Sequence, residues 1–286
     1  MKTQYRVFIY ILKQYGFSDT FLMWLFNNYK DENIPRIIFS NEYALNQNLE
    51  GHVTKKDISL VNSDKFMEFL NERKNELVNY FYEYPNSKIL FKYDNNILDK
   101  FMAKDIRPLF FYLRGSEELL NNKHFVGIIG TRTIDTEYKH KVPEVVKRYV
   151  KNDFAIISGL AQGTDTEVHK ETLKYGGKTI AVLPTNFNKI YPKENEKLVK
   201  EIFSKGLAIS AVGPLENTYK SNFLTRNNYV AHLSDEIFVV QTGEKSGTMN
   251  TVRNAIKLKK KVKFLDQHND TLNNYLLKLG CEMVSL

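Results

Sequence analysis

The stretch FAIISGLAQGTDTEVH at residues 154–169 decides the fold. A short apolar run at residues 154–157 is followed at once by small residues, and a Thr-Asp-Thr sequence then opens a helical pattern. This order is typical of a strand-to-helix turn in which glycines let backbone N–H groups approach an anion. It is also typical of a plain strand-to-helix connection, and it matches neither GxGxxG nor GxxxxGK[ST]. The stretch therefore indicates an α/β fold and leaves phosphate binding open.

The same pattern recurs along the C-terminal part of the chain. From residue 125 onward, short apolar runs alternate with segments that have helical spacing. Strands that are apolar on both faces and separated by single helices are typical of a parallel sheet with helices on both sides. We therefore expect a doubly wound, mostly parallel, Rossmann-like sheet. The expected strands are residues 125–130, 154–158, 179–183, 207–211, 237–241 and 262–265.

The first 82 residues have a different pattern. Apolar residues recur at helical spacing near residues 5–12, 21–26 and 66–81. We expect a small helical domain over residues 1–82 and the sheet domain over residues 83–286. Lys13 and Gln14 interrupt the apolar patch near the N-terminus and no cleavage site follows, which argues against a signal peptide. No apolar run is long enough for a membrane span.

The net charge of +8 is unevenly distributed. Residues 125–286 carry 24 Lys and Arg against 17 Asp and Glu, whereas residues 1–124 carry 17 against 16. A basic surplus confined to one domain suggests that this domain meets a polyanion. The alternative is a lysine-rich composition without functional meaning.

The cysteine and histidine residues limit which disulfides, metal sites and acid/base pairs are possible. Cys281 is the single cysteine, which excludes a disulfide framework and a cysteine-based zinc site and fits a reducing, cytoplasmic setting. Asp165 and His169 stand four residues apart and could serve acid/base or metal chemistry. The other five histidines show no ligand spacing with them. We favour a capping Asp165 and a hydrogen-bonded His169 beneath the crevice, with no metal and no cofactor.

The ligand crevice of a doubly wound sheet lies beyond the carboxyl ends of its strands. The loops expected there are rich in glycines, hydroxyls and cations and poor in carboxylates, a composition that suits a nucleic-acid or nucleotide phosphate. Phe187 and Tyr191 add rings on which bases could stack. Arg132 follows the first strand of the sheet, and Asp135 is the one nearby carboxylate that could pair with it instead.

Six motifs resemble those of the DprA/Smf family, in that family's order and spacing, over about residues 84–284. They are GxxGTR at 127–132, SGLAQGTDTEVH at 158–169, GGKTIAVL at 176–183, YPKEN at 191–195, FLTRNN at 223–228 and SGTMNTVRNA at 246–255. The resemblance implies a Rossmann-like, SLOG-type fold preceded by a SAM-like helical domain. It also implies a homodimer that binds and protects single-stranded DNA and loads a RecA recombinase during transformation, without enzymatic turnover.

The resemblance also implies which residues contact DNA. Arg132 and Lys178 match the family's phosphate-contacting cations, and Arg226 and Asn227 match the first two residues of its RNR motif. The full set of candidate DNA-binding residues is Arg132, Ser158, Gly159, Gly163, Lys178, Phe187, Tyr191, Arg226, Asn227, Lys245, Ser246, Gly247 and Thr248.

Three positions depart from the family pattern. Asn228 stands for the last arginine of RNR, Gln241 for a glutamate at a strand end, and Ala211 for an acidic residue. The first change removes a phosphate contact, while the other two make the crevice more positive, so a divergent role such as defence is open. A nucleotide-binding sensor or nucleotide phosphoribohydrolase on the same fold is the alternative function. It is the weaker hypothesis, because Glu244 is the only carboxylate in the corresponding loop.

Overall fold

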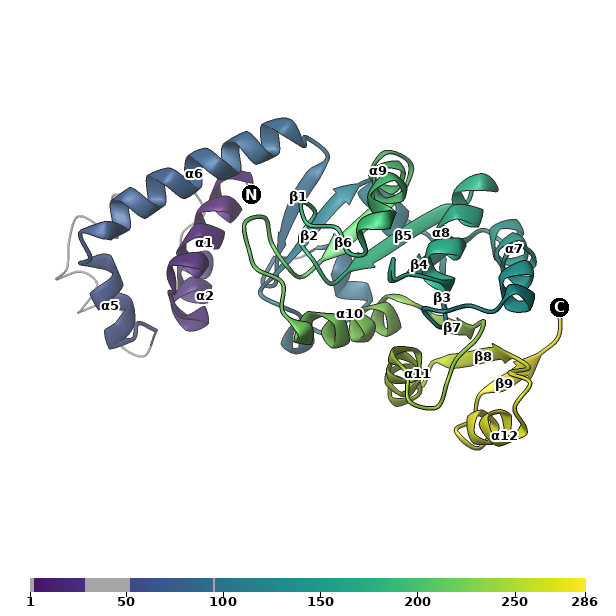
Figure 1. Ribbon diagram of the computed structural model, residues 1–286. Coiled ribbons are helices and arrows are strands. Elements are labelled where there is room, and N and C mark those ends of the chain that lie inside the picture. Colours follow the sequence, from purple (N-terminus) through teal and green to yellow (C-terminus); the bar gives the residue numbers. More distant parts are fainter. Residues whose placement is uncertain (1–2, 29–51, 95) are drawn as a thin grey trace. The chain divides into compact units, whose positions relative to one another are not determined.

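The computed structural model describes residues 3–28, 52–94 and 96–286 (Figure 1). The chain divides into two compact units. One comprises Met1–Asn95 with Arg107–Phe111, and the other comprises Asn96–Ile106 with Tyr112–Leu286. The sequence-based boundary between residues 82 and 83 stays a prediction.

The first unit is mainly helical, as predicted for the N-terminal part. Its aromatic side chains form much of its core, where the ring of Tyr15 lies 4.9 Å from those of both Phe66 and Phe69. The buried Asp57 carboxylate accepts hydrogen bonds from the Thr54 and Ser18 backbone N–H groups and so fixes the entry to two helices. The elements are α1 (Thr3–Tyr15), α2 (Asp19–Asn28), α5 (Lys55–Val61), α6 (Lys65–Glu83) and β1 (Ser87–Phe91).

The second unit alternates strands and helices along the chain. Short 3₁₀ turns lie at Ile97–Lys100, Lys104–Ile106, Glu117–Asn121 and Lys193–Asn195. Strand β2 (Phe110–Gly115) begins in the first unit and continues into the second. The other main elements of the second unit are β3 (His124–Ile129), α7 (Thr136–Lys151), β4 (Phe154–Ser158), α8 (Thr164–Lys174), β5 (Lys178–Leu183), α9 (Glu196–Lys205), β6 (Leu207–Ser210), α10 (Lys220–Leu233), β7 (Glu236–Val239), α11 (Gly247–Lys257), β8 (Lys261–Leu265), α12 (Asp270–Lys278) and β9 (Glu282–Val284).

The strands form one sheet in the order β1-β2-β6-β5-β4-β3-β7-β8-β9. All neighbours from β6 to β9 are parallel, and β2 adds antiparallel to β6. Helices α7, α8 and α9 cover one face, and α10, α11 and α12 cover the other (Figure 1). The predicted doubly wound, mostly parallel fold is therefore confirmed. The strand order reverses direction between β3 and β7, which is where such folds place their ligand.

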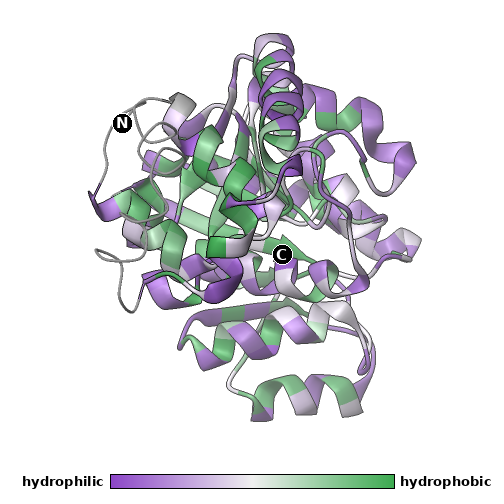
Figure 2. Cartoon of the chain, turned by 90° about the vertical axis from the view of Figure 1, so that its left-hand side faces the viewer, coloured by the Kyte–Doolittle hydropathy of each residue, from purple (hydrophilic) through white to green (hydrophobic). Residues whose placement is uncertain are grey.

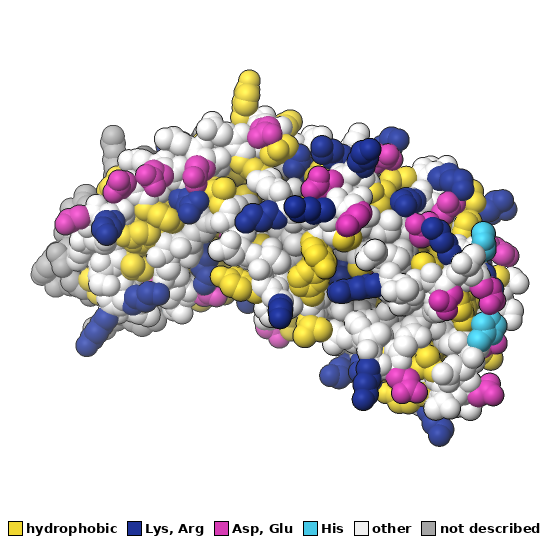
Figure 3. Space-filling model, in the orientation of Figure 1, with side chains coloured by type: hydrophobic (Ala, Val, Ile, Leu, Met, Phe, Trp, Pro, Cys, Tyr) yellow, Lys and Arg dark blue, Asp and Glu magenta, His cyan; other side chains and the backbone are white. Residues whose placement is uncertain are grey.

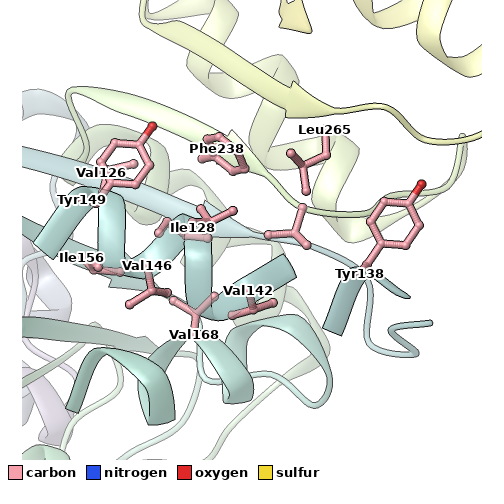
Figure 4. Packing of buried hydrophobic residues seen from close by; sticks show 12 residues of the cluster. Val126, Ile128, Tyr138, Val142, Val146, Tyr149, Ile156, Val168, Phe238 and Leu265 are labelled. Carbon is pink, nitrogen blue, oxygen red and sulfur yellow. The ribbon is translucent and has the colours of Figure 1, made fainter. Parts of the chain in front are cut away.

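The core explains why these segments became strands. Val126, Ile128 and Ile156 of the central strands are fully buried against α7, whose Val142 and Val146 face them (Figure 4). Because helices cover both faces of the central strands, the sequences of these strands are continuous runs of apolar residues. Figure 2 shows the same division, with hydrophobic colour on the strands and mixed colour on the helices. Within the described part of the chain, the helices are too short or too polar to cross a bilayer.

Candidate nucleic-acid interface

A cavity of about 400 Å³ opens at the carboxyl edge of the sheet, where the strand order reverses. It is formed by the turn after β3, the loop after β4, one side of α10 and the start of α11, which meet there although they lie far apart in sequence. Its lining residues are Ile129, Gly130, Thr131, Arg132, Gly159, Ala161, Asp165, Arg226, Asn227, Val230, Ser246, Gly247, Thr248 and Thr251.

The loop after β4 folds tightly against the turn after β3. The Thr164 backbone N–H donates to the Thr131 carbonyl at 3.1 Å. Gly163 precedes α8 with a φ of 79°, and a Cβ there would lie 2.3 Å from the Arg132 carbonyl oxygen. Only glycine fits both restrictions. Gly163 was predicted to contact DNA, but it does not line the cavity and its role here is structural, because it brings the positive N-terminus of α8 close to the cavity.

The start of α11 is anchored by its own polar residues. The Ser246 hydroxyl accepts a hydrogen bond from the Met249 N–H at 3.1 Å, and the Thr248 hydroxyl donates to the Gly130 carbonyl at 2.9 Å. The Asn227 amide donates to the Gly247 carbonyl at 3.2 Å. These predicted residues do meet at the cavity. Their side chains hold α10, α11 and the β3 turn together, which positions the second helix N-terminus at the site.

Arg226 lies almost entirely buried at the centre of the site. Its guanidinium donates to the Gly159 carbonyl, and it lies 3.9 Å from the Asp165 carboxylate. A Cβ on Gly159 would lie 1.6 Å from the Arg226 Nη1 atom, so glycine is needed to admit the arginine. Burial lowers the pKa of Arg226, Asp165 raises it and the nearby charge of Arg132 lowers it. Arginine nevertheless stays protonated in proteins, so Arg226 brings a buried positive charge to the cavity.

The Arg226 Nε atom is also buried and has no hydrogen-bond partner among the residues that the structure describes. Buried donors without a partner are rare in folded proteins, and each carries a desolvation cost. An acceptor that enters the cavity could relieve that cost.

Asp165 and His169 form the layer beneath Arg226. Burial raises the pKa of Asp165, and its carboxylate accepts a hydrogen bond from the Ala161 N–H at 3.2 Å. The residue that caps α8 is Gly163, so Asp165 braces the preceding loop instead of capping the helix. His169 Nδ1 lies 2.7 Å from the Thr179 hydroxyl, and burial lowers the pKa of His169 to about 3. The prediction of a hydrogen-bonded His169 beneath the crevice is confirmed, and no group of three metal-ligating side chains occurs within residues 3–28, 52–94 and 96–286.

Arg132 is the exposed cation of the site. No other described residue forms a hydrogen bond or an ion pair with its guanidinium. The turn that carries it is fixed by Gln241, whose carbonyl accepts from the Thr131 N–H at 2.8 Å and whose amide oxygen accepts from the Asp135 N–H at 2.9 Å. The Gln241 amide also donates to the Asp135 carboxylate. Asp135 is therefore engaged with Gln241, one of the three family departures, and leaves Arg132 available to a ligand.

Lys178 is not brought to this crevice. It is the first residue of β5 and therefore lies at the amino edge of the sheet, roughly 17 Å along the strand from the carboxyl end. There its ammonium group lies 2.6 Å from the Asp153 carboxylate and 2.7 Å from the Asn122 side-chain oxygen. The interpretation of Lys178 as a crevice cation is corrected accordingly.

The two predicted aromatic residues lie in opposite environments. Phe187 is only 6% exposed and packs edge-on against Phe203 of α9 at 5.6 Å, so its ring belongs to the core and offers no face to a base. Tyr191 is 53% exposed and packs edge-on against Phe223 of α10 at 5.4 Å. The structure therefore supports Tyr191 as a stacking candidate and removes Phe187.

Two further predicted residues do not line the cavity. The Ser158 hydroxyl is fully buried and donates to the Ile128 carbonyl at 2.7 Å, which is a structural bond between adjacent strands. Lys245 is exposed on the loop before α11. It adds charge to the carboxyl edge without facing the cavity itself.

One residue near the start of α10, Phe223, was missed as a ligand candidate. Phe223 lines a small hollow of about 60 Å³ together with Tyr191, Arg132 and Arg226. Phe223 and Arg226 stand three residues apart, and that helical spacing within the FLTRNN motif could have placed them on one face.

The fold and the site define a class of proteins, the Rossmann-like proteins with a cationic crevice at the point where the strand order reverses. Within that class, a family model described as DNA recombination-mediator protein A matches residues 88–284. The chain belongs to this family, and the resemblance to DprA/Smf proteins is confirmed.

Individual relatives agree with this assignment. The DNA processing proteins DprA of Streptococcus pneumoniae and Bacillus subtilis are each 33% identical over 150 residues, which is 52% of this chain and 52% and 50% of theirs. The chain thus matches about half the length of these curated relatives. The X-ray structure of DprA from Streptococcus pneumoniae aligns with a TM-score of 0.68 and 25% identity, over 98% of this chain and 94% of that one. A Helicobacter pylori DprA structure, whose description concerns its single-stranded DNA binding mode, aligns with a TM-score of 0.62 and 30% identity over 70% and 91%.

Proposed function

We propose that this protein binds single-stranded DNA in the carboxyl-edge crevice and acts as a recombination mediator of the DprA type. In this role it protects the strand, passes it to a RecA-type recombinase, works as a cytoplasmic homodimer and catalyses no covalent step. The function of the family and the single-stranded DNA binding of the Helicobacter pylori relative support the proposal.

The observation that carries the proposal is the pair of arginines at the cavity. Arg132 is exposed and has no partner among the described residues, while the buried Arg226 feels the charge of Arg132 as a repulsion. A phosphate between them would be attracted by both charges and would replace that repulsion with two attractions. The N-termini of α8 and α11 favour an anion at the same place.

The surroundings of the cavity favour a single strand over a duplex. Tyr191 and Phe223 lie beside Arg132 around the small hollow. Bases can stack on such rings only when they are unpaired, because in a duplex their faces are covered by neighbouring bases. A phosphate on the arginines and a base on Tyr191 would together hold one strand without reading its sequence.

A nucleotide hydrolase is the weaker proposal on the same fold. Glu244 is exposed and does not line the cavity. The carboxylate that does line it, Asp165, is held by the Ala161 N–H and lies beside Arg226. Its position suits the support of an arginine better than the activation of a water molecule.

Fluorescence polarisation with a labelled 20-nucleotide single strand, the matching duplex and free nucleotides as competitors tests the proposal at several salt concentrations. We expect the single strand to bind most tightly, with log K falling by about 0.7 per phosphate contact for each unit of log salt. Free nucleotides should compete poorly, because they offer one phosphate group and one base. A flat salt dependence or a preference for duplex would contradict the proposal. Delivery to a recombinase is measured separately, by the rate at which RecA filaments form on strands coated with this protein.

A further inference from the structure

A second hollow lies next to the crevice, between α8 and α9. We call it the α8–α9 groove. Its volume is about 840 Å³, roughly twice that of the crevice. It is lined by Arg132, Thr133, Ile134, Lys139, Gln162, Gly163, Thr166, Glu167, Lys170, Leu173, Lys174, Pro192, Glu194, Asn195, Lys197, Leu198, Glu201 and Lys205.

We propose that this groove is a second binding site for the DNA backbone, which carries the single strand onward from the crevice. The inference rests on the proposed function, because it extends the path of the same ligand. It assigns a role to the outer sides of α8 and α9, which the crevice does not use.

The groove is continuous with the crevice. Arg132 and Gly163 lie at its beginning, and Arg132 also lines the crevice. From there the lining follows α8 and α9 to their last turns, at Lys174 and Lys205. The 11 residues of α8 span roughly 16 Å, which is long enough for a few stretched nucleotides. A strand whose phosphate lies at Arg132 therefore has a direct path into the groove.

The charges of the groove suit a polyanion. Six lining residues are cationic and three are acidic. Three of the six cations are paired, because Glu167 lies 3.2 Å from Lys170 and 3.6 Å from Lys139, and Glu171 lies 2.9 Å from Lys174. In the portion of the chain that the structure describes, no carboxylate pairs with Lys197 or Lys205. These two exposed lysines stand at opposite ends of α9 and, with Arg132, space positive charge along the whole groove.

The groove differs from the crevice in chemistry, which indicates how it would hold a strand. Its apolar floor is aliphatic, with Ile134, Leu173 and Leu198, and none of its lining residues is aromatic. Bases therefore have no ring on which to stack, and attraction between lysines and phosphates must supply the affinity. Figure 3 shows Lys and Arg side chains spread over the second unit on the face drawn, with Asp and Glu side chains interspersed among them.

Charge reversal on α9, with strands of two lengths, tests the proposal. The double variant Lys197→Glu/Lys205→Glu changes two exposed side chains in the first and last turns of one helix. The matched control is Lys257→Glu/Lys278→Glu, which changes net charge equally at exposed last-turn positions of α11 and α12. Binding of four-nucleotide and 20-nucleotide oligothymidylates is measured by fluorescence polarisation, and thermal melting confirms that both variants are folded.

We expect the α9 variant to bind the 20-nucleotide strand about tenfold more weakly than the control does, with a salt slope lower by about 1.4, which corresponds to two lost phosphate contacts. The affinity for the four-nucleotide strand, which the crevice alone can hold, should change less than twofold.

Equal affinity of both variants for the long strand would overturn the groove proposal while the crevice proposal stands. Equal losses on both strands would overturn it too. If the wild type binds neither strand, both proposals fall.

Discussion

At the amino edge of the sheet, Lys178 is held by the Asp153 carboxylate and the Asn122 side chain at 2.6 and 2.7 Å. At the carboxyl edge, the Arg132 guanidinium is exposed and none of the described side chains pairs with it. Both cations stand in family motifs, and both were expected to contact phosphate. A cation that is already paired with a carboxylate gains little interaction free energy from a phosphate ligand. An unpaired cation beside a second arginine gains much more. We therefore expect the edge of the sheet and the pairing of the side chain, and not charge alone, to decide which of the two cations binds DNA.

The largest losses of stability and DNA affinity are expected for a change at Arg226, and they should far exceed those for Lys178 at the amino edge. Arg226→Met leaves Asp165 buried without its partner, so the free energy of unfolding should fall by about 3–5 kcal/mol and DNA affinity should collapse. The double variant Asp165→Asn/Arg226→Met should recover much of the stability, because no uncompensated charge remains, but none of the affinity. Lys178→Met should cost less than about 1 kcal/mol, because that pair is exposed to solvent. Urea denaturation and polarisation measure both quantities, and recovered DNA binding in the double variant would remove Arg226 from the site.

The next comparison concerns the two rings of one loop. Phe187→Ala should lower the free energy of unfolding by about 3–5 kcal/mol, because it empties a buried position against Phe203, while the folded fraction binds DNA normally. Tyr191→Ala should leave the melting temperature nearly unchanged and weaken binding by about 1–3 kcal/mol. If Tyr191→Ala instead lowers stability and binds DNA normally, while Phe187→Ala is stable and binds weakly, then Tyr191 is structural.

A smaller effect is expected on the pH dependence of stability, and it concerns a buried histidine. His169 is buried under the crevice with its pKa lowered to about 3, so its contribution to stability is complete above about pH 6.5 and is lost as the pH falls toward 3. Between pH 6.5 and 5, the wild type should lose about 2 kcal/mol more stability than His169→Gln does. Parallel pH dependences for the wild type and His169→Gln would contradict the buried, neutral assignment.

The sequence was sufficient to predict the parallel strands of the sheet and half of the 14 residues that line the crevice. Buried parallel strands must be apolar on both faces, so their runs are visible at 125–130 or 154–158 without any tertiary information. Gly159 and Gly163 were predicted as glycines that let the backbone approach an anion, whereas in the structure their close packing against Arg226 and the Arg132 carbonyl is what excludes any other residue.

Burial of loop side chains could not be predicted in the same way. Phe187 follows the end of β5 and seemed exposed, but it folds back onto Phe203, a contact that depends on where α9 packs. The pairing of Lys178 with Asp153 likewise depends on two strands lying side by side. Of the three family departures, Gln241 has a structural explanation in its bonds to Asp135, and nothing in the structure explains Asn228 or Ala211.

The most direct test of the account compares Arg132→Ala with Lys178→Ala on the same single strand. The two variants lose the same charge at opposite edges of the sheet, and polarisation titrations at low salt together with thermal melting are recorded for each. Arg132→Ala should weaken binding by about 1.5–3 kcal/mol, roughly 10- to 150-fold, with an unchanged melting temperature, whereas Lys178→Ala should bind within about twofold of the wild type. Equal losses of affinity in the two variants, or a loss confined to Lys178→Ala, would contradict the assignment of DNA binding to the carboxyl edge.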